Sequence, residues 1–251
     1  MQYGLQQVRL TPKGRVSQRV DGWKMEICGG KIETRFADHH ANEVALISFE
    51  PGATEITLHC SGEVETEDTN GIVGKQRGFV PLWLFQTATD LTRATSNVRR
   101  LTQGLQGAYD NDIALLHALS ARILEAVPYQ IGATDAATSA DAALGQGFGV
   151  CQDHAHLFLA TARALGFAAR YVSGYLKMDA QVHQDATHAW AEAYVDGVGW
   201  VGFDVSNAIS PDARYVRIAT GLDYREAAPV SGLRFGQGGE TLTVDVAVQQ
   251  Q

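Results

Sequence analysis

The chain has 251 residues, of which 45% are hydrophobic and 19% charged, and its formal net charge is −8. This composition is typical of a globular protein, and the length allows one large domain or two smaller ones. The acidic balance argues against nucleic acid or an anionic membrane as the main partner, because both bind to basic patches.

The N-terminus shows no basic segment followed by an apolar one, so we expect no signal peptide. No apolar stretch approaches the roughly 18–20 residues of a membrane-spanning helix. The three cysteines, Cys28, Cys60 and Cys151, are too few for a disulfide framework. We therefore expect a cytoplasmic protein with reduced thiols, in which Cys28 and Cys60 are small apolar side chains of strands.

The first hundred residues carry little helical periodicity. Segments with the composition of strands recur at 23–27, 43–49 and 55–65, and turn formers such as Gly29-Gly30 and Pro51-Gly52 separate them. This spacing predicts an antiparallel β sandwich or barrel-like module over residues 1–101.

Two adjacent histidines, His39 and His40, lie in a predicted turn between two strands. They could bind a metal ion, but the sequence spacing places no third ligand, and a solvated turn is much commoner. We therefore predict no metal and no cofactor.

The pattern becomes helical after about residue 105, and residues 102–251 are predicted to form a second domain. Apolar residues recur with helical spacing from Ile113 to Val127 and stop before Pro128, while Ser139–Gly145 predicts a short capped helix. A third helix is expected to start at Cys151 and to end at Gly166.

Cys151 is expected at the N-terminal end of the buried face of this third helix. Unpaired N–H groups and the helix dipole at such a position stabilise an anion, here a thiolate. Three glycines upstream, Gly145, Gly147 and Gly149, allow the backbone to approach a substrate closely. Cys151 is therefore the candidate nucleophile.

A β-hairpin is predicted from His188 to Val205, with its turn near Asp196-Gly197. A three-residue loop at 195–197 would place His188 opposite Asp204, whereas a two-residue turn would place these two side chains on opposite faces. We predict the looser turn, since Gly197 and Gly199 permit it.

Four blocks of this sequence, in this order, resemble the bacterial transglutaminase-like cysteine peptidases: Gly149–Asp153, Gly166–Tyr175, His188–Glu192 and Gly199–Asp204. The resemblance spans about residues 110–210, and the strand-rich first part resembles the β-module that precedes the catalytic core in that family. It implies an α+β fold, with a papain- or transglutaminase-like core whose nucleophile lies at a helix N-terminus packed on an antiparallel sheet.

The resemblance also implies a triad in which Cys151 is the nucleophile, His188 the base and acid, and Asp204 the residue that orients the imidazole. One departure concerns the loop after the aspartate, where Val205-Ser206-Asn207 replaces the family's usual proline-threonine-asparagine. Five residues are expected near the substrate cleft: Tyr129, Gln146, Gly149, Tyr175 and Trp190.

The expected reaction is acyl transfer on peptide or isopeptide amide bonds of a peptide or protein substrate, most simply hydrolysis. Three alternatives stay open: protein crosslinking, acetyl transfer by an N-acetyltransferase-like enzyme that also uses Cys-His-Asp, and a non-catalytic peptide-binding module. The sequence leaves the natural substrate and the oligomeric state open.

Overall fold

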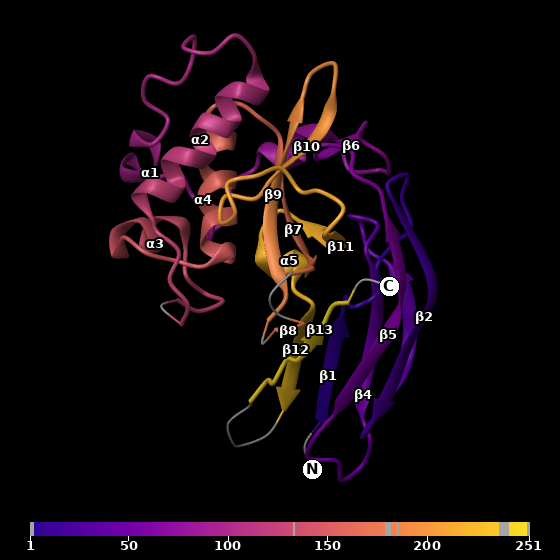
Figure 1. Cartoon of the computed structure of the whole chain (residues 1–251). Helices are drawn as coiled ribbons and strands as arrows, with labels where there is room; N and C mark the ends of the chain where they lie inside the picture. Colours follow the sequence, from indigo (N-terminus) through magenta and orange to yellow (C-terminus); the bar gives the residue numbers. More distant parts are fainter. Residues whose placement is uncertain (1–2, 133, 179–181, 185, 236–240, 250–251) are drawn as a thin grey trace.

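The computed structural model describes residues 3–132, 134–178, 182–184, 186–235 and 241–249. It is a mixed α/β structure in which helices cover one side of a central sheet and long antiparallel strands lie on the other side (Figure 1). The α+β fold class expected from the sequence is confirmed.

The core sheet has five strands in the order β11-β7-β9-β10-β6, and each pair of adjacent strands is antiparallel. The strands are β6 (Ile72–Gly74), β7 (Ala169–Leu176), β9 (His188–Val195), β10 (Gly199–Phe203) and β11 (Tyr215–Gly221). The residues of β9 and β10 are almost all buried because both faces of the sheet are covered.

Five helical segments accompany this sheet: α1 (Ser96–Arg100), α2 (Asp112–Ala126), α3 (Ala140–Gln146), α4 (Cys151–Ala164) and α5 (Tyr224–Ala227). The predicted helices α2, α3 and α4 are present, and the side chains of Asn111 and Ser139 cap the first two. Helix α4 packs against β9, whose buried Ala189, Ala191 and Ala193 belong to the same hydrophobic core as Leu157. These small side chains allow the helix to lie close to the sheet.

Most of the N-terminal strands lie in a four-stranded sheet and in a separate two-stranded ribbon. The sheet has the order β12-β1-β4-β3, with β1 (Tyr3–Val8), β3 (Gly30–Ala37), β4 (Glu43–Phe49) and β12 (Val230–Phe235). The ribbon pairs β2 (Gln18–Cys28) with β5 (Thr57–Thr66). Apolar residues of the sheet and the ribbon share one core cluster that includes Ile47, Met25 and Leu58.

Two strands pair with strands from the other side of the predicted boundary at residue 101. Strand β12, which comes from the C-terminal part, pairs with β1 from Val8↔Val230 to Tyr3↔Phe235. Strand β6, which comes from the N-terminal part, pairs with β10 in the core sheet. Each of the two larger sheets therefore contains a strand from the other part of the chain.

Three short elements complete the described residues: a 3-10 helix (Leu82–Gln86) and the paired strands β8 (His183–Gln184) and β13 (Val246–Ala247). Among the described residues, no helix is long and apolar enough to cross a membrane.

Candidate active site

Cys151 is the first residue of α4, and its side chain is partly buried. The preceding residue, Val150, has an extended backbone, and its N–H donates to the Asp153 carboxylate over 2.8 Å. The Thr134 hydroxyl donates to the same carboxylate oxygen over 2.5 Å. Asp153 therefore fixes the start of the helix, and with it the position of the thiol.

Gly149 is required at the approach to this helix. A Cβ atom at position 149 would lie 2.9 Å from Cβ of Asp153, closer than real contacts allow. Gly149 also forms a parallel bridge with Tyr129, since the N–H of Gln130 donates to its carbonyl over 2.8 Å. The loop before Cys151 is thus held against the segment that follows α2.

The β9–β10 hairpin has the looser turn that the sequence predicts. Val195 pairs with Gly199 and Ala191 with Phe203, so residues 196–198 form a three-residue loop, one position later than expected. This changes the register by two residues, and because side chains alternate with a period of two, His188 and Asp204 stay on the same face. His188 therefore lies diagonally across from Asp204 rather than directly opposite.

His188 lies against Asp204, one of its two predicted partners. Its Nε2 lies 2.6 Å from Oδ2 of Asp204, while the ring is 8% exposed and Asp204 is 1% exposed. Burial alone would lower the pKa of His188, but hydrogen bonds and charge interactions with Asp204 and Cys151 raise this pKa to about 10. The imidazole of His188 therefore stays protonated at neutral pH. Since its Nε2 faces Asp204, its Nδ1 is the nitrogen left for the thiol.

Asp204 accepts two more hydrogen bonds on the same oxygen. The Tyr215 hydroxyl and Nδ2 of Asn207 each donate to Oδ2 over 2.7 Å. Burial would raise the pKa of Asp204, but the bonds from His188, Asn207 and Tyr215 and the charge of His188 lower it below its usual range. The carboxylate is therefore kept ionised beside the imidazolium.

The loop after Asp204 is tightly closed although it departs from the family's usual sequence. The N–H of Asp204 donates to the carbonyl of Ile209 over 2.8 Å, and the N–H of Ile209 donates back over 3.2 Å. Ala208 turns the chain with a φ of 55°. Asn207 is thereby returned to Asp204, and Ser206 is directed at helix α4.

Helix α4 carries two histidines, His154 and His156, whose buried rings bond to neighbouring segments and not to the proposed triad. The Ser206 hydroxyl lies 2.8 Å from Nδ1 of His154, whose Nε2 lies 2.7 Å from the carbonyl of Val127. Burial lowers the pKa of His154, and it lowers that of His156 to about 3. His156 accepts the N–H of Tyr224. Both rings are held neutral by burial.

Besides Gly149, the predicted cleft residues differ in exposure and in the residues that they contact. Tyr129 is 48% exposed, and its pKa is raised by burial and by the charges of Cys151 and Asp204. Trp190 is buried and stacks on His188, with ring centroids 6.3 Å apart. Gln146 is exposed at the end of α3. Tyr175 stacks with Trp23 of the β2–β5 ribbon at 6.4 Å.

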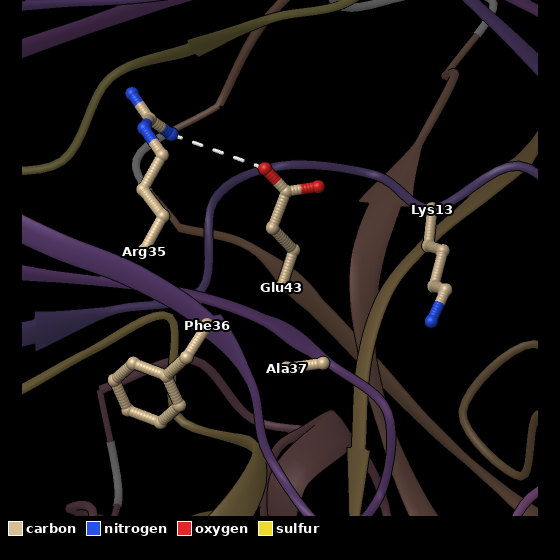
Figure 2. Close-up of a pocket in the computed structure, with 5 residues that line it drawn as sticks. All are labelled: Lys13, Arg35, Phe36, Ala37 and Glu43. Atoms are coloured by element: carbon tan, nitrogen blue, oxygen red, sulfur yellow. Dashed lines mark ion pairs between the residues drawn. The ribbon is translucent and has the colours of Figure 1, made fainter.

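A surface hollow of about 250 Å³ lies away from these residues, on the N-terminal sheet (Figure 2). Figure 2 shows its lining residues, with Arg35 and Glu43 facing one another across a 3.9 Å ion pair. Because it contains none of Cys151, His188 and Asp204, it plays no part in the candidate active site.

Comparison with protein families gives two matches. Residues 99–205 match the transglutaminase-like superfamily, and residues 1–65 match the bacterial transglutaminase-like N-terminal region. The first match contains Cys151, His188 and Asp204.

Related proteins agree with these matches. An uncharacterized protein of Mycobacterium leprae is 30% identical over 254 residues, covering 96% of this chain and 90% of the relative. An uncharacterized protein of Mycobacterium tuberculosis is 36% identical over 146 residues, covering 54% of this chain and 46% of the relative.

A solved structure supports the fold. A protein from Cytophaga hutchinsonii, described as a candidate cysteine protease, superposes with a TM-score of 0.76. The match has 24% sequence identity and covers 100% of this chain and 89% of that one. The chain belongs to the transglutaminase-like superfamily and carries the bacterial transglutaminase-like N-terminal region.

Proposed function

We propose that this protein is a cysteine peptidase or amidase, which transfers an acyl group from a peptide or isopeptide bond to Cys151 and then to water. The observation that carries the proposal is the buried His188–Asp204 pair, with Nε2 of His188 2.6 Å from Oδ2 of Asp204, together with the influence of Cys151 on the pKa of the same imidazole. A thiolate, an imidazolium and an orienting carboxylate are the parts of a thiol nucleophile system.

The reaction starts with attack of the Cys151 thiolate on the amide carbonyl. The oxyanion that forms is stabilised by the backbone N–H of Cys151, at the first position of α4, where helix N–H groups lack intrahelical partners. Imidazolium His188 then protonates the leaving amine, which leaves a thioester on Cys151. His188 next removes a proton from water, and the resulting hydroxide releases the acid product.

Tyr129 is the candidate for a second donor to the oxyanion. Tyr129 forms a backbone bridge with Gly149, two residues before Cys151, and burial, followed by the charges of Cys151 and Asp204, raises the pKa of its phenol. The phenol therefore stays protonated while the thiolate is present, and it keeps an O–H to donate. Its 48% exposure leaves it accessible to a bound substrate.

Hydrolysis is favoured over transfer to an amine because solvent reaches the site. Cys151 is partly exposed and Tyr129 is half exposed, so water can reach a thioester without a second substrate site. We assign the activity to the cytoplasm, in keeping with the reduced thiols that the mechanism requires.

The decisive experiment is mass-spectrometric capture of the thioester from a mixed peptide and isopeptide library, with and without a primary-amine probe. We expect a covalent adduct at Cys151 that decays to the free acid in water, and no adduct with Cys151→Ala. Stable incorporation of the amine in preference to hydrolysis would show that the protein is a crosslinking enzyme and not a peptidase. Turnover of the captured substrates by Cys151→Ala would exclude covalent catalysis.

A further inference from the structure

The turn between β3 and β4 brings two histidines to a glutamate from the other end of the chain. One nitrogen from each of His39 and His40 and one carboxylate oxygen of Glu226 lie within 4.8 Å of one another. The histidines belong to the N-terminal part, and Glu226 belongs to α5, which follows the last strand of the core sheet. The fold thus supplies the third ligand that sequence spacing does not place.

Several hydrogen bonds hold this turn in place. Oδ1 of Asp38 accepts the N–H groups of His40 and Asn42 over 3.0 and 2.9 Å, and Oδ2 accepts Nε of Arg9 over 3.2 Å. The Asn42 side chain makes two hydrogen bonds to the backbone of Thr220 on β11, of 2.7 and 2.8 Å. The histidine-bearing turn is therefore fixed on the core sheet, next to α5.

His40 has one ring nitrogen engaged and the other unsatisfied. Its Nε2 lies 2.7 Å from Oε2 of Glu226, whereas the buried Nδ1 has no hydrogen-bond partner among the described residues. The His40 side chain is only 1% exposed. Nε2 is thus held in a buried position beside a carboxylate oxygen, where an ion can take the place of the proton between them.

Glu226 is available as a ligand although a buried arginine lies near it. The Arg163 guanidinium donates to the carbonyls of Phe85, Ala169 and Leu222 and to the hydroxyl of Thr92, at 2.7–2.9 Å. It makes no ion pair with Glu226 among the contacts of the described residues. Oε2 of Glu226 is instead oriented by the N–H of Leu222 over 2.7 Å.

We propose that His39, His40 and Glu226 form a divalent metal site, for which Zn²⁺ is the best match. Two imidazole nitrogens and one carboxylate oxygen are ligands that zinc accepts, with bonds of roughly 2.0–2.2 Å and an open fourth position. Ligand atoms around such an ion lie about 3.3 Å apart by tetrahedral geometry. The His40–Glu226 contact would open slightly, and the exposed His39 can rotate to bind.

The metal would join the N-terminal part to the core at a point remote from Cys151 in the sequence. Because it binds the folded arrangement and not the unfolded chain, it would raise the melting temperature. This role is independent of the proposed peptidase activity.

The test is a Zn²⁺ titration of metal-free, tag-free full-length protein by calorimetry, in a Cys151→Ala background so that the thiolate cannot bind zinc. We expect one equivalent to bind, and His39→Ala and Glu226→Gln each to weaken binding by at least about 10-fold. His59→Ala is the matched control, because His59 is also exposed but lies on β5. This control should bind as the parent does.

Cobalt substitution gives a second measurement. Co²⁺ bound to the parent protein should show visible absorption of a tetrahedral nitrogen–oxygen site, and His39→Ala should lose it. The proposal is wrong if the parent binds less than a tenth of an equivalent, or if His39→Ala and His59→Ala bind zinc equally. Should Glu226→Gln fail to fold, the exposed His39 variant decides the result by itself.

Discussion

Strand β9 carries two buried charged groups, His188 at its start and Glu192 four residues later. Oε2 of Glu192 accepts Nε of Arg170 over 2.7 Å, and Oε1 is paired with Nη2 of Arg217. Arg170 also lies over the Trp200 ring at 4.0 Å. His188, in contrast, pairs with a single carboxylate, and its pKa is also raised by Cys151, whose thiol is partly exposed.

The two clusters show that a buried charge is not in itself a sign of catalysis. Both groups are more than nine-tenths buried on the same strand. Glu192 is fully buried and paired with two guanidinium groups. His188, in contrast, carries a proton that it can exchange with the partly exposed thiol of Cys151. The first arrangement fixes the sheet, and the second can move a proton.

The largest effect is expected from removing the reactive pair. Cys151→Ser and His188→Ala should each lower kcat/KM by about 10⁴-fold or more, because each removes an entire step of the chemistry. Both variants should keep the parent's circular dichroism spectrum, since neither leaves a large core cavity. Full activity of Cys151→Ser in a steady-state assay would contradict covalent catalysis.

Glu192→Gln should have the opposite effect: it should lower stability and leave the activity of the folded protein unchanged. Removing the carboxylate leaves two buried guanidinium groups without their counter-charge, which should lower the free energy of unfolding by about 3–5 kcal/mol. The rate per folded molecule should stay near that of the parent. Urea unfolding measures the first quantity, and Glu65→Gln, at the exposed Arg19–Glu65 pair, is the control that should change little. A large loss of kcat at full folding would give Glu192 a role in the reaction.

Asp204→Asn should lower kcat by about 10²–10³-fold, less than loss of the imidazole itself. The amide can still contact His188, but it no longer stabilises the imidazolium. The pH–rate profile distinguishes this role from a purely structural one, since loss of the carboxylate should lower the pKa of His188. An unchanged profile would show that Asp204 does not control the charge of His188.

The stability difference between the parent and Asp204→Asn should depend on pH in a defined way. The raised pKa of His188 contributes stability that is complete below its unfolded pKa of 6.5 and is lost as the pH rises towards about 10. The lowered pKa of Asp204 contributes stability that is complete above its unfolded pKa of 3.8 and is lost as the pH falls through the folded value. The difference should therefore be largest between about pH 4 and pH 6.5 in thermal unfolding. A difference that is flat from pH 4 to pH 10 would contradict the ion pair.

The smallest effect concerns exposure and reactivity. Cys28 is exposed, while Cys151 is only partly so. If exposure alone controlled alkylation, iodoacetamide would label Cys28 first. We expect Cys151 to react first at pH 7 if it is the nucleophile, because it begins helix α4, where helix N–H groups lack intrahelical partners. Peptide mapping of the labelled protein measures the order, and prior labelling of Cys28 would favour a non-catalytic binding module.

The sequence predicted the elements that carry local signals. The helix start at Cys151 follows from its glycine-rich approach, and the looser hairpin follows from Gly197 and Gly199. The position of the loop could not be predicted to one residue, because loops at 195–197 and 196–198 both keep His188 and Asp204 on one face. The role of Cys151 followed from its place at a helix start as well as from the family resemblance, those of His188 and Asp204 from the predicted hairpin and the resemblance, and all three stay predictions.

Contacts between distant segments could not be read from the sequence. Asn207 had a usable signal, since an asparagine three residues after an aspartate often returns to it within a turn. Tyr215 had none, because its reach to Asp204 depends on how β11 is placed beside β7. The approach of Glu226 to His40 depends in the same way on the docking of the β3–β4 turn.

The pairing of β1 with β12 also bears on how the protein is made. During translation β1 leaves the ribosome long before its partner, Val230–Phe235. Until then β1 has one free edge, and unpaired strand edges promote aggregation of nascent chains. The N-terminal sheet therefore stays incomplete until β12 has been synthesised, and a messenger truncated before the codons of β12 would yield a protein with that edge open.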